Sequence, residues 1–198
     1  MDKKDRIAVV MGGPSKEREV SLNTGNAILN ALKGKGYDAV AIDLDPHHIV
    51  DQLKESGAKV VFNAVHGLYG EDGRLQGILE MLGIPYTGSG VLASALAMDK
   101  VYTKHLFQNN HVPTAKCIFL DKKIDKEPKA RILKEIGIPC VVKPATQGSS
   151  IGVVIVKDES QLDGALDEAF KYGDHVLCEA FFTGKEVAAG VMMGEDGR

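Results

Sequence analysis

Short apolar runs that alternate with segments of helical periodicity most constrain the fold of this 198-residue sequence. Residues 7–11 form an apolar run that ends at Gly12-Gly13, and apolar residues at helical spacing follow between positions 22 and 32. The cycle repeats with strands expected at residues 39–44 and 60–65 and helices at residues 49–54 and 75–82. Fully apolar strands separated by helices are typical of a parallel sheet covered by helices. The first half of the chain is therefore predicted to be an α/β unit.

The pattern changes after a longer helical segment, residues 91–110, which is broken at Asn110-His111-Val112-Pro113. Beyond it we expect strands at residues 117–120, 140–144, 153–156, 175–178 and 186–193 and helices at residues 127–135 and 162–170. This half is interpreted as α+β, with a mostly antiparallel sheet. We place the domain division between an N-terminal α/β unit, residues 1–98, and a second unit, residues 99–198.

The composition favours small-molecule partners over nucleic acid or membrane. The formal net charge is -3, and charges of both signs are mixed along the chain without a basic run. No stretch approaches the roughly 20 apolar residues that span a bilayer, and residues 7–11 are too few for the roughly 7 to 15 of a signal-peptide core. The three cysteines, Cys117, Cys140 and Cys178, lack disulfide or zinc-site spacing. We therefore expect a cytoplasmic protein with buried, reduced cysteines.

Neither of the common glycine motifs for nucleotides is a strong match. The chain contains no Walker A sequence, which argues against a P-loop site. Gly88-Ser89-Gly90-Val91-Leu92-Ala93 fits G-x-G-x-x-A, but Pro85 precedes it and no acidic residue follows at the distance that binds a ribose. A Rossmann dinucleotide site is therefore not expected.

A second glycine-rich segment has the chemistry of a polyphosphate cover. Lys143 stands at the end of an apolar strand and is followed by a loop, residues 145–152, that is rich in serine and glycine. Backbone amides and serine hydroxyls of such a loop donate hydrogen bonds to phosphate oxygens, while a lysine neutralises their charge. The alternative is an ordinary hairpin connection in which Ser and Gly serve only turn geometry. Local chemistry leaves both open.

Two pairs of polar residues suggest further contacts with ligands. Glu179 and Glu186 flank a loop between expected strands, where strand-edge groups can bind an adenine edge and a carboxylate can accept from ribose hydroxyls. Glu17 and His66 follow strands of the expected parallel sheet, whose carboxyl edge commonly binds ligands. Alternatively, Glu179 and Glu186 are ordinary solvent-facing carboxylates. Glu17 would then be an acid favoured at a helix N-terminus, and His66 an ordinary loop histidine.

Several of these motifs occur in a fixed order along the chain. They are Gly12-Gly13, Lys16-Glu17-Arg18-Glu19-Val20-Ser21, His66-Gly67, Gly70-Glu71-Asp72-Gly73, Gln76-Gly77, Pro85-Tyr86-Thr87-Gly88-Ser89-Gly90, Met98-Asp99-Lys100, Val142-Lys143-Pro144 and Gly148-Ser149-Ser150-Ile151-Gly152. Together they resemble the D-alanine-D-alanine ligases of the ATP-grasp superfamily. The resemblance implies a parallel sheet of the pre-ATP-grasp type followed by the first ATP-grasp subdomain. The C-terminal ATP-grasp part is expected to be absent.

The resemblance also implies roles for individual residues. The two catalytic residues would be Glu17 and Ser149, with Glu17 holding the ammonium of the first D-alanine and supporting Ser149. Val20, Ser21 and His66 would line the substrate pocket. The residues expected to bind ATP are Lys100, Lys143, Gly148, Ser149 and Ser150 at the phosphates, Glu179, Ala180 and Phe182 at adenine, and Glu186 at the ribose.

The implied reaction joins two D-alanine molecules through an acyl phosphate formed with ATP, for peptidoglycan synthesis. We expect Mg²⁺ as a cofactor, with its ligands in the family's later part, and a homodimer. Because the chain stops at Arg198, little or no turnover by this chain alone is expected. The alternatives are a D-alanine-D-lactate ligase and a non-catalytic remnant that binds nucleotide or amino acid.

Overall fold

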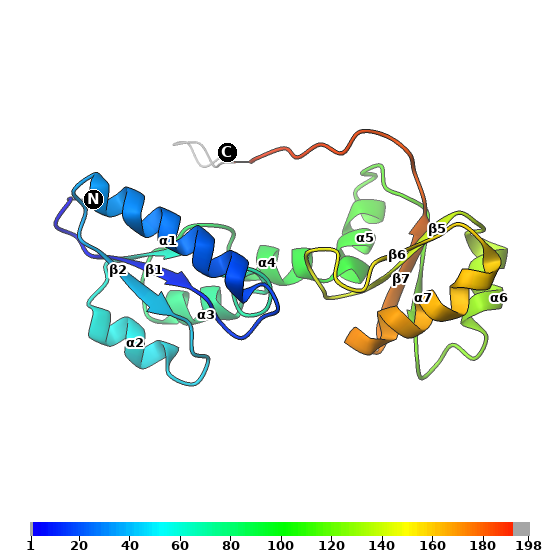
Figure 1. Ribbon diagram of the computed structural model, residues 1–198, viewed down its shortest axis with the longest axis horizontal. Helices are drawn as coiled ribbons and strands as arrows, with labels where there is room; N and C mark the ends of the chain where they lie inside the picture. Colours follow the sequence, from blue (N-terminus) through cyan, green and yellow to red (C-terminus); the bar gives the residue numbers. More distant parts are fainter. Residues whose placement is uncertain (1, 192–198) are drawn as a thin grey trace.

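The computed structural model describes residues 2–191 of the chain. Figure 1 shows two separate sheets, each with its own helices, and between them the helices α4 (Val91–Met98) and α5 (Lys100–Asn109). Within the described residues, no helix is long and apolar enough to cross a membrane.

The first sheet is parallel, as predicted, with strand order β2-β1-β3. Its strands are β1 (Ile7–Met11), β2 (Ala39–Asp43) and β3 (Val60–Asn63). All five residues of β1 are buried because helices cover both faces of the central strand. Alternate residues point to opposite faces, so Ala8 and Val10 pack with the helices at residues 49–56 and 74–81, whereas Val9 packs with the helix at residues 18–34.

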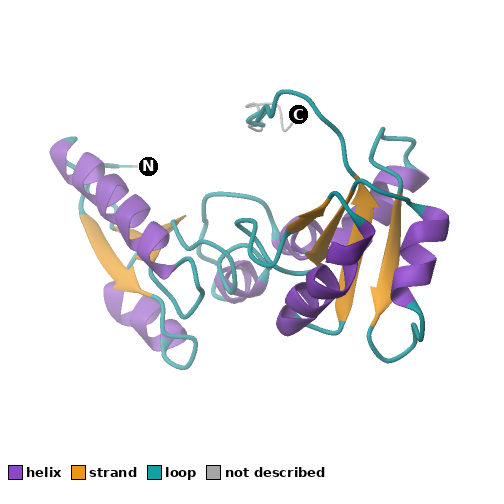
Figure 2. Ribbon diagram, turned by 45° about the vertical axis from the view of Figure 1, so that its right-hand side comes forward, coloured by secondary structure: helices purple, strands orange, loops and turns teal. Residues whose placement is uncertain are grey.

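The helices around this sheet match the predicted segments closely. They are α1 (Arg18–Gly34), α2 (Ile49–Ser56) and α3 (Arg74–Met81). Figure 2 shows α1 and α2 on opposite sides of the sheet. Gly57 ends α2 in the left-handed conformation, with φ 64°, which glycine adopts without steric cost. The strand-loop-helix order brings the loops after β1 and β3 to one edge of the sheet.

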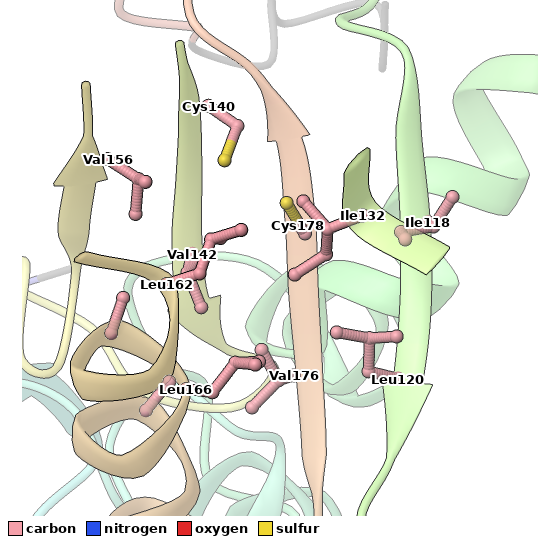
Figure 3. Packing of buried hydrophobic residues seen from close by; sticks show 12 residues of the cluster. Ile118, Leu120, Ile132, Cys140, Val142, Val156, Leu162, Leu166, Val176 and Cys178 are labelled. Carbon is pink, nitrogen blue, oxygen red and sulfur yellow. The ribbon is translucent and has the colours of Figure 1, made fainter. Parts of the chain in front are cut away.

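The second sheet is antiparallel throughout, with strand order β4-β7-β5-β6. Its strands are β4 (Cys117–Asp121), β5 (Cys140–Pro144), β6 (Val154–Val156) and β7 (His175–Ala180). The helices α6 (Pro128–Glu135) and α7 (Leu162–Ala169) cover one face, and the short 3-10 helices η1 (Glu159–Gln161) and η2 (Phe170–Tyr172) flank α7. Figure 3 shows side chains from all four strands and both α-helices in one core, including the buried Cys140 and Cys178.

The single helix predicted for residues 91–110 is wrong, because the structure has two helices there. They are α4 (Val91–Met98) and α5 (Lys100–Asn109). Asp99 is extended (φ -91°, ψ 109°), and its carboxylate accepts hydrogen bonds from the amides of Val101 at 2.8 Å and Tyr102 at 3.3 Å. Aspartate is a preferred N-cap, so it starts a new helix. The proposed division between residues 98 and 99 falls at this break and stays a prediction.

The strand predicted for residues 186–193 is also wrong as far as the structure describes it. Residues 181–191 contain neither helix nor strand, and Val187 and Val191 are 90% and 92% exposed. Both edges of β7 are already paired, with β4 and β5, and an apolar segment without a pairing neighbour does not form a stable strand. Residues 192 and 193 of that expected strand lie outside the described residues.

Candidate functional site

A cavity of about 480 Å³ lies where loops of the first sheet meet loops of the second. The first sheet contributes the loops after β1 and β3, at the carboxyl edge where ligands of open parallel sheets bind. The second sheet contributes the glycine-rich loop after β5. The lining residues are Pro14, Ser15, Lys16, Glu17, Gly67, Leu68, Asp72, Arg74, Ala95, Met98, Asp99, Thr146, Gln147, Gly148 and Ile151.

Glu17 lies at the centre of this meeting point. It is the N-cap residue of α1, and its amide donates to the Ser15 hydroxyl at 3.1 Å, which in turn donates to the His66 carbonyl at 2.8 Å. A Cβ placed on Gly67 would lie 2.5 Å from Glu17 Oε2, and one on Gly148 would lie 3.2 Å from the same atom. The Glu17 carboxylate therefore lies against a loop from each sheet, and a side chain at position 67 would have to displace it from a backbone whose φ of 71° already favours glycine.

The glycine-rich loop has an unusual backbone at its two serines. Ser149 and Ser150 are exposed and have φ angles of 51° and 58°, in the left-handed region that few non-glycine residues occupy. Neither hydroxyl hydrogen-bonds to another described residue, so both are available to a ligand. Gly152 has φ 70°, and a Cβ there would lie 2.7 Å from the Tyr172 ring. Over that ring stands the Lys16 ammonium, 4.4 Å from its centre, which links the loop after β1 to η2.

Lys100 joins α5 to the same loop. Its amide donates to the Ala145 carbonyl at 2.9 Å, and its ammonium donates to the Gln147 carbonyl at 2.5 Å. Burial and the neighbouring Lys143 ammonium lower the pKa of the Lys100 amine below its ordinary value. The structure thus brings together Lys100, Lys143 and the loop, the groups predicted to meet phosphates.

Lys143 is paired with Glu179, and a residue that sequence reasoning missed completes the group. Glu179 Oε1 accepts from the Lys143 ammonium, and Oε2 accepts from Lys104 at 2.7 Å. Burial on its own would raise the pKa of the Glu179 carboxyl, but hydrogen bonds from Lys104 and Lys143 outweigh burial and hold that pKa below its ordinary value. Lys104 follows Lys100 by four residues, and that helical spacing was the available signal.

Ser21 is fully buried and bonded to the backbone on both sides. Its hydroxyl donates to the Ala64 carbonyl at 2.7 Å and accepts from the Gly12 amide at 2.8 Å. It therefore joins the segments that follow β1 and β3. Its predicted place in the substrate pocket stays a prediction.

The other two residues predicted for that pocket do not line the 480 Å³ cavity. Val20 is 54% exposed on α1. His66 lines a neighbouring cavity of about 350 Å³, where its ring nitrogens lie 3.3 Å from Thr24 Oγ1 and 3.4 Å from Glu71 Oε1. The first sheet thus holds Glu17 and His66 on adjacent loops rather than in one described cavity.

The residues predicted for the adenine and ribose end are only partly gathered. Ala180 ends β7, and its amide donates to the Lys116 carbonyl at 2.9 Å. Phe182 is 72% exposed, and Glu186 is exposed on the segment that leaves the second sheet in Figure 1. Among residues 2–191, no three His, Cys, Asp or Glu side chains come together to hold a metal ion.

Comparison with known proteins identifies the family. The family model "D-ala D-ala ligase N-terminus" matches residues 6–56 and 50–89, and "D-ala D-ala ligase C-terminus" matches residues 106–198. A curated D-alanine–D-alanine ligase of Moorella thermoacetica is 48% identical over 193 residues, which cover 94% of this chain and 62% of that protein. The chain belongs to the D-alanine–D-alanine ligase family. It spans about 60% of the length of the curated ligases that it matches.

Solved ligases share the arrangement of the two sheets. A crystal structure of the Bacillus anthracis D-alanine–D-alanine ligase has a TM-score of 0.83 and 39% identity, covering 91% of this chain and 58% of the ligase. A second structure of that ligase, complexed with ATP, has a TM-score of 0.79 and 37% identity, covering 91% of this chain and 60% of the ligase. The fold is thus that of a ligase from an ATP-grasp family.

Proposed function

We propose that this chain forms the ATP-binding and first-substrate-binding part of a D-alanine–D-alanine ligase. The observation that carries the proposal is the position of the Glu17 carboxylate beside Gly148, where a Cβ would lie 3.2 Å from Oε2. It puts an ammonium acceptor next to a loop suited to phosphates. Relatives that are named D-alanine–D-alanine ligases, one of them solved with ATP, support the same function.

In the proposed reaction the carboxylate of the first D-alanine attacks the γ-phosphorus of ATP, and ADP leaves. The resulting acyl phosphate is attacked at its carbonyl carbon by the amine of a second D-alanine, and phosphate leaves with formation of the dipeptide. Glu17 would accept hydrogen bonds from the ammonium of the first D-alanine and hold its carboxylate toward the loop. Positioning and charge stabilisation dominate such phosphoryl transfer.

The phosphates are proposed to lie between the glycine-rich loop and the two lysines. Lys100 and Lys143 would neutralise phosphate charge, while the Ser149 and Ser150 hydroxyls and the Gly148 amide would donate to phosphate oxygens. The adenine would lie at Glu179, Ala180 and Phe182, and the ribose hydroxyls at Glu186. These assignments rest on the resemblance together with the pairing of Glu179 and Lys143.

The wider setting is proposed on the same basis. Magnesium is expected to accompany ATP, held by groups other than the described residues. The dipeptide would serve peptidoglycan synthesis in the cytoplasm, and the protein is expected to act as a homodimer.

Replacing Lys143 tests the phosphate assignment. Lys143→Met is expected to weaken ATP binding by about 1.5–3 kcal/mol, or about ten- to 150-fold in Kd, because it removes a charge-assisted contact. Isothermal titration with ATP measures the change. Lys157→Met, at an exposed lysine of the same half, is the matched control and should bind ATP like the unaltered chain. Equal affinities for Lys143→Met and the control would refute the assignment.

Replacing Glu17 tests the amino-acid assignment. Glu17→Gln is expected to weaken D-alanine binding by about tenfold or more, because the ammonium loses its charged acceptor, and to change ATP affinity far less. Saturation-transfer NMR with D-alanine and calorimetry with ATP measure the two affinities. Glu19→Gln, at an exposed position in the first turn of α1, is the control. Equal losses for both ligands would contradict a separate amino-acid site.

A further inference from the structure

Lys104 is buried, with 8% of its surface exposed. It is the one charged side chain among the buried polar residues that the structure describes. Its ammonium donates to Glu179 Oε2 at 2.7 Å, to Thr114 Oγ1 at 2.6 Å and to the Ala115 carbonyl at 3.3 Å. An ammonium has three protons, and these three acceptors use all of them. Lys104 therefore has no donor left for a ligand.

Lys143 is placed differently on the other side of the same carboxylate. Within residues 2–191 its ammonium has one acceptor, Glu179 Oε1, and its side chain is more exposed than that of Lys104, at 20% against 11%. Two of its three donors are thus available to a ligand. The two lysines share one carboxylate, but only Lys143 has spare hydrogen-bonding capacity.

This asymmetry matters when a phosphate draws Lys143 away. A buried carboxylate that loses its counterion is costly, because neither water nor another charge replaces the lost interaction. If Lys143 were the sole partner of Glu179, a phosphate would have to compete with that carboxylate for the ammonium. Lys104 supplies a permanent second counterion, which lowers the cost of releasing Lys143.

We propose that Lys104 is a positioning residue that keeps Glu179 charged and fixed, so that Lys143 is free to transfer from Glu179 to a phosphate of the nucleotide. The inference rests on the proposed binding of ATP. It assigns to Lys104 no contact with the nucleotide, and it predicts an effect on ATP binding that acts through Glu179.

The first test needs no nucleotide. The titration of the Glu179 carboxyl carbon is followed by NMR in the unaltered chain and in Lys104→Met. The titratable groups near this carboxyl are Lys100 and Lys104 on α5, Lys143 on β5, Cys117 on β4, and Cys178, which precedes Glu179 on β7. Loss of Lys104 should raise the pKa of Glu179, whereas Lys171→Met, which breaks an exposed pair with Glu168, should leave it unchanged. An unchanged Glu179 titration in Lys104→Met would overturn the inference by itself.

The second test measures ATP binding by calorimetry. Lys104→Met should bind ATP about tenfold more weakly than the unaltered chain while Glu179 is charged, and the defect should shrink as the pH falls through the pKa of Glu179 found in the first test, because protonation releases Lys143. The double variant Lys104→Met/Glu179→Gln should bind ATP more tightly than Lys104→Met alone, because a neutral amide holds Lys143 weakly. A purely structural role predicts a defect that is independent of pH and is not relieved by the second substitution.

Two controls keep the outcomes distinct. If Lys104→Met does not fold, as judged by circular dichroism, Lys104→Gln and the double variant take its place in both tests. Failure of the unaltered chain to bind ATP would overturn the proposed function and with it the transfer of Lys143. Binding by the unaltered chain with an equal affinity for Lys104→Met would overturn the inference alone.

Discussion

Glu179→Leu is expected to destabilise the part of the protein around the second sheet by about 3–5 kcal/mol. The substitution leaves the Lys104 and Lys143 ammonium groups without their shared carboxylate, in side chains that are 11% and 20% exposed. Urea unfolding followed by hydrogen exchange in β4, β5 and β7 measures the loss. Glu135→Leu, which breaks an exposed pair with Arg131, should cost about 0.5 kcal/mol or less. Equal losses for the two variants would show that the buried pair contributes no more than a surface pair.

The effect of Glu179→Leu should also depend on pH. The pKa of Glu179 is lowered in the folded protein, so the stabilisation by this carboxylate is complete above the ordinary glutamate pKa of 4.5 and is lost as pH falls through the lowered value. Unfolding curves of the variant and of the unaltered chain should therefore converge in acid. A difference in unfolding free energy that stays constant down to low pH would mean that the stability lost in Glu179→Leu does not come from the charge of Glu179.

Ser21→Ala is the second substitution with a large expected effect. It leaves the Gly12 amide and the Ala64 carbonyl without their buried partner, at about 1–3 kcal/mol for each group. The first sheet should be destabilised, and the loop that carries Glu17 should become more mobile because β1 and β3 lose their link at the carboxyl edge. Chemical denaturation and hydrogen exchange at Gly12 measure the two effects.

A matched control is available at another buried serine. Ser94 is 7% exposed, and among residues 2–191 its hydroxyl has one hydrogen-bond partner, the Ser89 carbonyl at 3.2 Å. Ser94→Ala should therefore cost about 1 kcal/mol or less. A loss of stability for Ser21→Ala no larger than that of Ser94→Ala would show that water replaces the Ser21 hydroxyl.

The sequence predicted the two sheets well because their strands and helices have strong apolar periodicity. Strand β1, for example, has the same bounds in the prediction and in the structure. The prediction failed where a local polar contact or a missing neighbour decides the outcome. Asp99 caps α5 within an otherwise continuous helical pattern, and residues 186–191 are apolar enough for a strand but have no strand beside them.

The candidate site was predictable from ordered motifs but not from individual residues. Glu17, Lys100, Lys143 and the glycine-rich loop were predicted because they form part of motifs, and the structure brings them close together, while their roles stay a prediction. Lys104 was missed because a lysine on a charged, mostly exposed helix usually faces solvent. Its burial depends on Thr114, ten residues further along, and on Glu179, which is distant in sequence. The four-residue spacing from Lys100 places Lys104 on the same side of α5 but does not reveal these partners.

Helix α5 links two parts of the site as a rigid rod. Lys100 in its first turn binds the carbonyl of Gln147 in the glycine-rich loop, and Lys104 one turn later binds Glu179 on β7. A ten-residue helix is about 15 Å long and stiff over that length. If α5 tilted about the extended backbone of Asp99, the ammonium groups of Lys100 and Lys104 would therefore move together. The distance between the glycine-rich loop and the Glu179 carboxylate is therefore fixed by one turn of α5. A ligand that contacts both must have a length that matches this turn.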